Sequence, residues 1–184
     1  MTLFVNACVR RKSRTERLAR ALLGTFDDKI EEVKLNELRF PQTDEGLLRE
    51  RDRLISAGRF GAPMFVLARQ FAKADTIVIA APYWDLSFPA ALKEYFEHIN
   101  VIGVTFTYTE DGVPQGLCQA KKLYYVTTSG GTDVPDEFGY GYVKALCEKF
   151  YGIKDTTLIK AEGLDIVGNN AEEIIEEKIR QIKS

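Results

Sequence analysis

The sequence predicts an α/β protein built on a parallel sheet, and three features of the chain support this. Short apolar runs that suit buried strands alternate along the chain with segments of helical spacing. The run over residues 76–81 is rich in β-branched residues and ends at Pro82, which predicts a central strand buried on both faces. Glycine and hydroxyl residues follow another run at residues 128–131, where a strand would turn toward the next helix.

Each element has its own signal in the chain order. The expected strands are apolar or alternating runs at residues 2–6, 31–35, 76–81, 122–128 and 156–161. The expected helices have apolar residues at helical spacing and cover residues 13–26, 42–56, 64–74, 88–99, 142–150 and 171–182. Pro63 suits the first position of a helix. Residues 104–108 alternate and meet Asp111-Gly112, which predicts a hairpin.

The order of these elements predicts the topology. Regular alternation of strands and helices implies parallel strands joined by right-handed crossovers, with helices on both faces of the sheet. Five parallel strands in a chain of 184 residues match the flavodoxin-like doubly wound fold, with the strand order 2-1-3-4-5. No linker or repeat divides the chain, so we expect a single domain over residues 1–184.

Composition excludes several classes of function. The net charge of −2 gives no electrostatic reason to expect a nucleic-acid partner, and no apolar run is long enough to span a membrane. Three cysteines without clustered spacing fit a reducing cytoplasm. The single histidine, His98, lies within an expected helix, where we expect a structural role. We therefore expect no metal site.

Three loops should meet at the carboxyl edge of the sheet, where ligands bind in this kind of fold: residues 6–15, 82–88 and 128–141. In the first loop, Ser13, Arg14 and Thr15 stand at a helix start, which can bind a phosphate. The same Ser-x-x-Glu pattern is also a capping box, which needs no ligand, and the two roles are compatible.

The other two loops suit a flat ring. Pro82, Tyr83, Trp84 and Asp85 offer aromatic faces and loop backbone, although the aromatic side chains could instead pack over the sheet or fill an interface. The last loop lets its backbone approach a flat group closely, although it could be an ordinary glycine turn. Its candidate residues are Thr128, Ser129, Gly130 and Gly131.

These motifs together resemble the FMN-dependent NAD(P)H:quinone and azo-compound reductases, a branch of the flavodoxin-like fold. The resemblance rests on residues 6–15, 80–93 and 128–131 and runs nearly from end to end. It implies FMN as cofactor, NADH or NADPH as co-substrate, and small-molecule electron acceptors. Ser13 and Thr15 would bind the FMN phosphate, with Arg14 nearby. Residues 82–85 would hold the isoalloxazine ring and ribityl chain, and residues 129–131 the pyrimidine edge.

The resemblance also implies a homodimer in which the partner covers the flavin face. Tyr140 and Tyr83 are candidate proton donors or stacking walls. Because the chemistry would belong to the cofactor, no side chain need act as an obligatory acid or base.

Two other functions remain open on the sequence. Cys8 and Arg14 satisfy the Cys-x5-Arg signature of low-molecular-weight protein tyrosine phosphatases, which would need a thiolate at Cys8. The loop lacks the glycine that would help it to wrap a phosphate, and no Asp-Pro pair supplies a general acid. A flavodoxin that only carries electrons is the second alternative, although such carriers are usually strongly acidic. A response-regulator receiver is excluded, because Asn6-Ala7 and Ala81-Pro82 stand where its aspartates would be.

Overall fold

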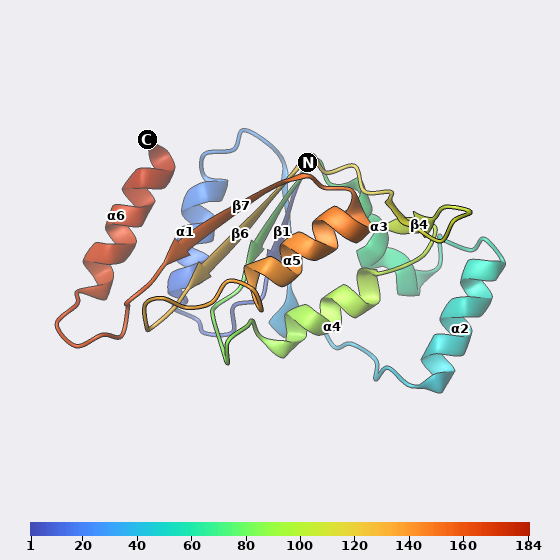
Figure 1. The fold of residues 1–184 in the computed structure, drawn as a ribbon, viewed down its shortest axis with the longest axis horizontal. Helices are drawn as coiled ribbons and strands as arrows, with labels where there is room; N and C mark the ends of the chain where they lie inside the picture. Colours follow the sequence, from blue (N-terminus) through green and yellow to red (C-terminus); the bar gives the residue numbers. More distant parts are fainter.

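Five parallel strands form the central sheet, in the spatial order β2-β1-β3-β6-β7 (Figure 1). The computed structural model describes all 184 residues, and these strands are β1 (Thr2–Asn6), β2 (Ile30–Lys34), β3 (Thr76–Ala80), β6 (Lys122–Thr128) and β7 (Asp155–Ala161). The order corresponds to the predicted order 2-1-3-4-5, because β4 and β5 form a separate hairpin. The predicted fold class is confirmed.

Every predicted helix is present, with shifts only at the ends. The helices are α1 (Arg14–Leu23), α2 (Glu45–Ser56), α3 (Val66–Lys73), α4 (Ala90–Ile99), α5 (Tyr140–Leu146) and α6 (Ala171–Lys183), with short turns η1 (Leu35–Glu37), η2 (Pro63–Phe65) and η3 (Cys147–Tyr151). Pro63 opens η2, as predicted. The helix expected over 142–150 begins at Tyr140 and finishes in the π-helical turn η3. None of these helices combines the length and apolarity that crossing a lipid bilayer needs.

The predicted hairpin is also confirmed. The antiparallel strands β4 (Phe106–Tyr108) and β5 (Pro114–Gly116) pair in register, with Phe106 opposite Gly116. Gly112 in the connecting turn has a φ of 75°, a left-handed conformation that glycine adopts without steric cost.

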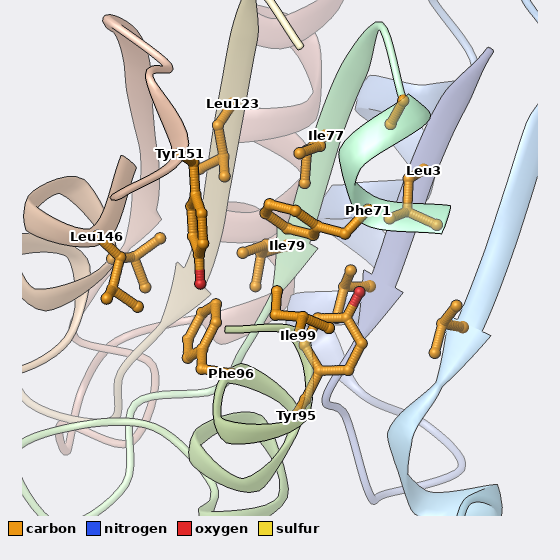
Figure 2. Close-up of a cluster of buried hydrophobic side chains, with 14 of the residues drawn as sticks. Leu3, Phe71, Ile77, Ile79, Tyr95, Phe96, Ile99, Leu123, Leu146 and Tyr151 are labelled. Carbon is orange, nitrogen blue, oxygen red and sulfur yellow. The ribbon is translucent and has the colours of Figure 1, made fainter. Parts of the chain in front are cut away.

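Helices cover both faces of the sheet. The helices α1 and α6 pack against each other on one face, through buried residues such as Leu18 and Ile175. The other face carries α3, α4 and α5 and the larger core, in which Phe71, Tyr95 and Tyr151 are almost completely buried (Figure 2). The exception is α2, which stands at the periphery of the molecule (Figure 1) and buries only Leu54.

Strand register brings the loops together. Asn6 of β1 is level with Ala80 of β3, and Ala80 is level with Val126 of β6. Thr128 at the end of β6 is level with Ala161 at the end of β7. Because these strands are parallel and in step, the loops that leave them begin side by side at one edge of the sheet.

Candidate functional site

A cavity of about 370 Å³ lies at the carboxyl edge of the sheet. The loops after β1, β3, β6 and β7 line it, through Val9, Arg10, Lys12, Ser13, Arg14, Thr15, Pro82, Tyr83, Trp84, Thr128, Ser129, Gly130, Leu164 and Asp165. The structure therefore brings together the predicted cofactor-binding residues, except Asp85 and Gly131. Its size lies within the range of small-molecule sites, roughly 300–1,000 Å³.

The first loop presents the start of α1 to this cavity. Ser13 Oγ accepts a hydrogen bond from the backbone N–H of Glu16 at 3.2 Å, which caps the helix. The hydroxyl of Thr15 is buried and lies 2.6 Å from that of Thr128, so it joins α1 to the end of β6. The N–H groups of Arg14 and Thr15 have no acceptor within the helix, and the helix dipole makes this end positive. An anion can bind here without displacing the cap.

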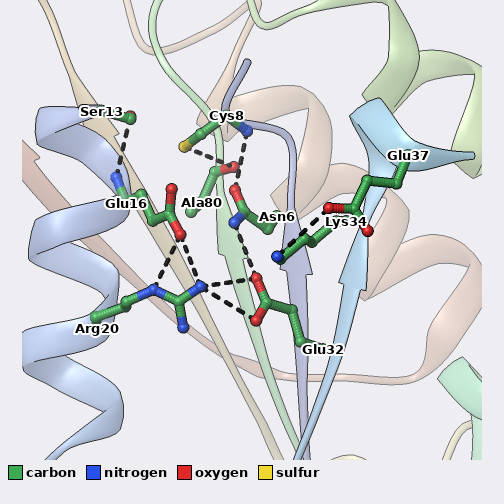
Figure 3. A network of polar contacts seen from close by, with 9 residues as sticks. All are labelled: Asn6, Cys8, Ser13, Glu16, Arg20, Glu32, Lys34, Glu37 and Ala80. Atoms are coloured by element: carbon green, nitrogen blue, oxygen red, sulfur yellow. Dashed lines mark hydrogen bonds and ion pairs between the residues drawn. The ribbon is translucent and has the colours of Figure 1, made fainter. Parts of the chain in front are cut away.

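A polar network beneath the first loop fixes its position (Figure 3). Asn6 at the end of β1 accepts a hydrogen bond from the Cys8 N–H at 3.0 Å and donates one to Glu32 of β2 at 3.0 Å. Glu32 also accepts a hydrogen bond from Arg20 of α1 at 2.9 Å. Two strands and one helix are therefore joined at the point where the first loop leaves β1.

The second loop contains a tight turn with an unusual backbone. Trp84 and Ser87 exchange two backbone hydrogen bonds, of 3.1 and 2.7 Å. The residues between them, Asp85 and Leu86, have φ angles of 50° and 68°. Both angles are left-handed, as in the type I′ turns that usually contain asparagine and glycine. The left-handed conformation costs a non-glycine residue roughly 1–2 kcal/mol. This strained turn places Trp84 at the rim of the cavity.

The third loop packs against the loop that follows β7. The N–H groups of residues 163–165 donate to the carbonyls of residues 129–131, at 2.9–3.2 Å. A Cβ atom on Gly130 would lie 2.5 Å from Asp165 Oδ2, so this packing requires a glycine or a displaced carboxylate. The N–H groups of Gly130 and Gly131 donate no hydrogen bond within the chain. At Gly130, this leaves a free donor on a residue that lines the cavity.

Sequence reasoning missed part of the lining. Leu164 and Asp165 come from a fourth loop, and Asp165 forms an ion pair with Arg14 at 2.9 Å across 151 residues of sequence. That loop has no aromatic residue and no run of hydroxyls, which were the signals that identified the others. Its position directly after the fifth strand was an available signal, because every parallel strand ends at the same edge.

The two candidate tyrosines differ in position. Tyr83 lines the cavity, and its hydroxyl is buried without a hydrogen-bond partner. Tyr140 does not line the cavity, and its hydroxyl contacts Thr156 Oγ1 at 2.9 Å, near the start of β7. The proton-donor role considered for Tyr140 is therefore not supported, because Tyr140 opens α5 and its hydroxyl is bound near the opposite end of the sheet.

The geometry also does not support the phosphatase alternative. Cys8 is buried, and its Sγ lies 3.8 Å from the carbonyl oxygen of Ala80. Burial raises the pKa of the Cys8 thiol to about 11, so the thiol is protonated at neutral pH. Arg14, the other half of the signature, is paired with Asp165. A phosphatase needs a thiolate that faces its substrate, and Cys8 is not among the residues that line the cavity.

A second hollow lies beneath α2 and is unrelated to these loops. Its volume is about 270 Å³, and its lining includes Leu47, Arg51, Met64 and His98. The imidazole of His98 stacks on Phe40 with a centroid distance of 4.9 Å, and its Nε2 is buried without a partner. Burial lowers the pKa of His98, which favours the neutral imidazole.

Comparison with known proteins places the chain in a family. A family model described as flavodoxin-like fold matches residues 1–184. An FMN-dependent NADH:quinone oxidoreductase of Clostridium beijerinckii is 36% identical over 185 residues, which cover 97% of this chain and 92% of that protein. A second, from Clostridium acetobutylicum, is 47% identical over 121 residues, which cover 63% of this chain and 60% of that protein.

A solved structure gives the same result. The crystal structure of an azoreductase from Bacillus anthracis superposes with a TM-score of 0.83 at 26% sequence identity, and covers 98% of this chain and 95% of that one. The matched length and identity agree with the resemblance that the loop motifs predicted. The chain belongs to the flavodoxin-like fold family and, within it, to the family of the FMN-dependent NADH:quinone oxidoreductases.

Proposed function

We propose that this protein is an FMN-dependent oxidoreductase that takes a hydride from NADH or NADPH and reduces quinone, azo or nitroaromatic acceptors. One observation carries the proposal: a single cavity gathers hydroxyls, free backbone donors and aromatic side chains from loops far apart in sequence. The family relatives, which are named FMN-dependent NADH:quinone oxidoreductases, support the same chemistry.

The residues of the cavity fit FMN. The cofactor has an anionic phosphate, a hydroxylated chain and a flat ring with polar edges. The start of α1 supplies Ser13, Thr15 and free N–H groups for the phosphate. Tyr83 and Trp84 supply aromatic surface for the ring, and the free N–H of Gly130 suits its polar edge. The buried Tyr83 hydroxyl is a polar group that still lacks a partner.

When bound, FMN supplies the hydride chemistry between the nicotinamide and the acceptor. The protein residues bind and orient. Ser13 and Thr15 would hold the phosphate end, while the loop at residues 129–131 would hold the polar edge of the ring. Trp84 stands at the rim, where it would limit the access of water to the ring. Tyr83 Oη is the candidate proton donor, because it is the side-chain hydroxyl that the second loop contributes to the residues lining the cavity.

A homodimer is part of the proposal. Three large apolar side chains near the cavity are exposed: Trp84 by 38%, Leu86 by 57% and Phe138 by 58%. The loops that carry them are joined, because Ser87 Oγ donates to the Phe138 carbonyl at 2.6 Å. Exposed apolar residues that gather in one region are typical of an interface. Light scattering of the purified protein should give twice the mass of the chain, and a monomer at micromolar concentration would contradict the assignment.

The three cysteines are free thiols, which supports a reducing compartment such as the cytoplasm.

The deciding experiment is an absorbance spectrum of the purified protein, followed by anaerobic addition of NADH and then of a quinone. We expect flavin bands that bleach with NADH and return with the quinone. If the protein binds flavin but does not oxidise NADH or NADPH, it is an electron carrier instead. If it does not bind added FMN, the proposal is contradicted.

A further inference from the structure

An ion pair crosses the cofactor cavity and includes one of the cationic side chains that line this cavity. Arg14 Nη1 lies 2.9 Å from Asp165 Oδ1, and both residues line the cavity. The neighbouring cations of the first loop, Arg10, Arg11 and Lys12, form no ion pair. The chain therefore places a carboxylate beside the one first-loop cation that stands in the first turn of α1, next to the proposed phosphate site.

The two partners differ in freedom to move. The backbone of Asp165 is held by the hydrogen bonds that join residues 163–165 to residues 129–131. Arg14 carries its charge on a long side chain that is 44% exposed, while the side chain of Asp165 is 70% exposed. An ion pair between exposed groups contributes little net stability, so a competing anion can exchange for one partner. Both backbones are fixed, Arg14 in α1 and Asp165 by these hydrogen bonds, so the longer arginine side chain is the one that can reach a new partner.

We propose that Asp165 is a specificity-determining residue that competes with the phosphate of the cofactor for Arg14. This inference rests on the proposed function. Asp165 holds Arg14 in an ion pair that must break before the guanidinium can engage the phosphate. It therefore holds the affinity for a phosphorylated flavin below the value that the surrounding cations would give. An uncharged flavin does not experience this competition. No covalent bond is formed or broken in the exchange.

The test compares two flavins on the full chain freed of cofactor. Quenching of flavin fluorescence gives the dissociation constants of FMN and of riboflavin, which lacks the phosphate. Asp165→Asn should tighten FMN by roughly two- to fivefold, because Arg14 no longer has to leave its carboxylate partner, and should leave riboflavin unchanged. Arg14→Gln should weaken FMN and not riboflavin. In the Arg14→Gln background, most of the gain from Asp165→Asn should disappear.

Glu177→Gln is the matched control. It also removes one negative charge from an exposed ion pair with arginine, but it lies on α6, away from the cavity. We expect no change in either dissociation constant. Circular dichroism checks that each variant is folded.

Three results would overturn the inference alone while FMN still binds. They are an unchanged or weaker FMN affinity in Asp165→Asn, an equal change for both flavins, and a gain that persists without Arg14. If the wild-type chain binds neither flavin, the proposed function fails as well, so the two failures can be told apart.

Discussion

Two hollows of this molecule, the cavity at the sheet edge and the hollow beneath α2, are close in size but differ in how they are built. The cavity at the sheet edge measures about 370 Å³ and takes its lining from four loops that follow four parallel strands. The hollow beneath α2 measures about 270 Å³ and lies under a helix that buries only Leu54. The first contains a capped helix start, a pinned glycine loop and a strained turn at its rim. The second is bounded on one side by a loosely attached helix.

The difference shows that the origin of the lining residues marks a site better than volume does. Loops that leave parallel strands in register lie at one edge of the sheet, so hydrogen-bond donors from residues far apart in the sequence lie close together there. Two of the three non-glycine residues with left-handed φ angles, Asp85 and Leu86, belong to the loop beside the cavity. None lies in the segments that contribute residues to the hollow beneath α2. Backbone strain of this kind tends to gather at functional sites.

The largest expected effect comes from Thr15→Val. Valine keeps the shape but removes a hydroxyl from the proposed phosphate site and leaves the Thr128 hydroxyl without its 2.6 Å partner. A hydrogen bond to a charged group contributes about 1.5–3 kcal/mol, so FMN should bind about ten- to a hundredfold more weakly. Fluorescence titration measures this. Thr43→Val makes the same change in the hollow beneath α2 and should leave FMN affinity unchanged. Equal losses in both variants would remove the distinction between the two hollows.

A smaller effect is expected from Leu86→Gly. Glycine relieves a φ of 68°, and the relief exceeds the entropy that glycine adds to the unfolded chain, so the free energy of unfolding should rise by about 0.5–1 kcal/mol. Urea denaturation measures the change, with oligomeric state matched by size-exclusion chromatography. Leu117→Gly, at another exposed leucine without a left-handed φ angle, should instead lower stability. A loss of stability in Leu86→Gly would show that the turn is not strained.

The smallest effect concerns His98 in the hollow beneath α2. Burial lowers its pKa in the folded chain, so the unfolded chain binds the proton at a higher pH. The stability from the neutral imidazole is therefore complete above a pH of about 6.5 and is lost as the pH falls through that value toward the folded pKa.

Because the side chain is only partly buried, we expect a small loss of stability as the pH falls from roughly 7.5 to 5.5. The loss should be absent in His98→Gln, as urea denaturation at a series of pH values would reveal. Stability that rises as the pH falls, in the wild type but not in the variant, would contradict the lowered pKa. FMN affinity should be the same in both proteins.

The sequence predicted the sheet order and most of the cavity, because each depended on local patterns and on topology. Apolar runs located the strands, and the parallel order then brought the helix start at Ser13, the loop at residues 82–85 and the glycine loop at residues 128–131 to one edge. Asp165 could not be predicted in the same way. Its role depends on a contact with Arg14 across 151 residues, and nothing in its local sequence indicates that contact.

Tyr140 lies outside the cavity for a different reason. Its aromatic and glycine-rich surroundings suggested a ligand loop, but the residue opens α5 and its hydroxyl contacts Thr156 instead of the cavity. The left-handed turn at Asp85 and Leu86 was also unpredictable, because neither residue is the glycine that such a turn usually contains.

The loose attachment of α2 determines where a protease would first cleave the native chain. With Leu54 as its one buried side chain, α2 can open while the sheet and the other helices remain folded. Trypsin would cleave the native protein first in α2, at the peptide bonds that follow its three arginines at positions 49, 51 and 53. Because β1 pairs with β3 across the cut, the two fragments would stay together, and because no residue of α2 lines the cavity at the sheet edge, that cavity would stay intact.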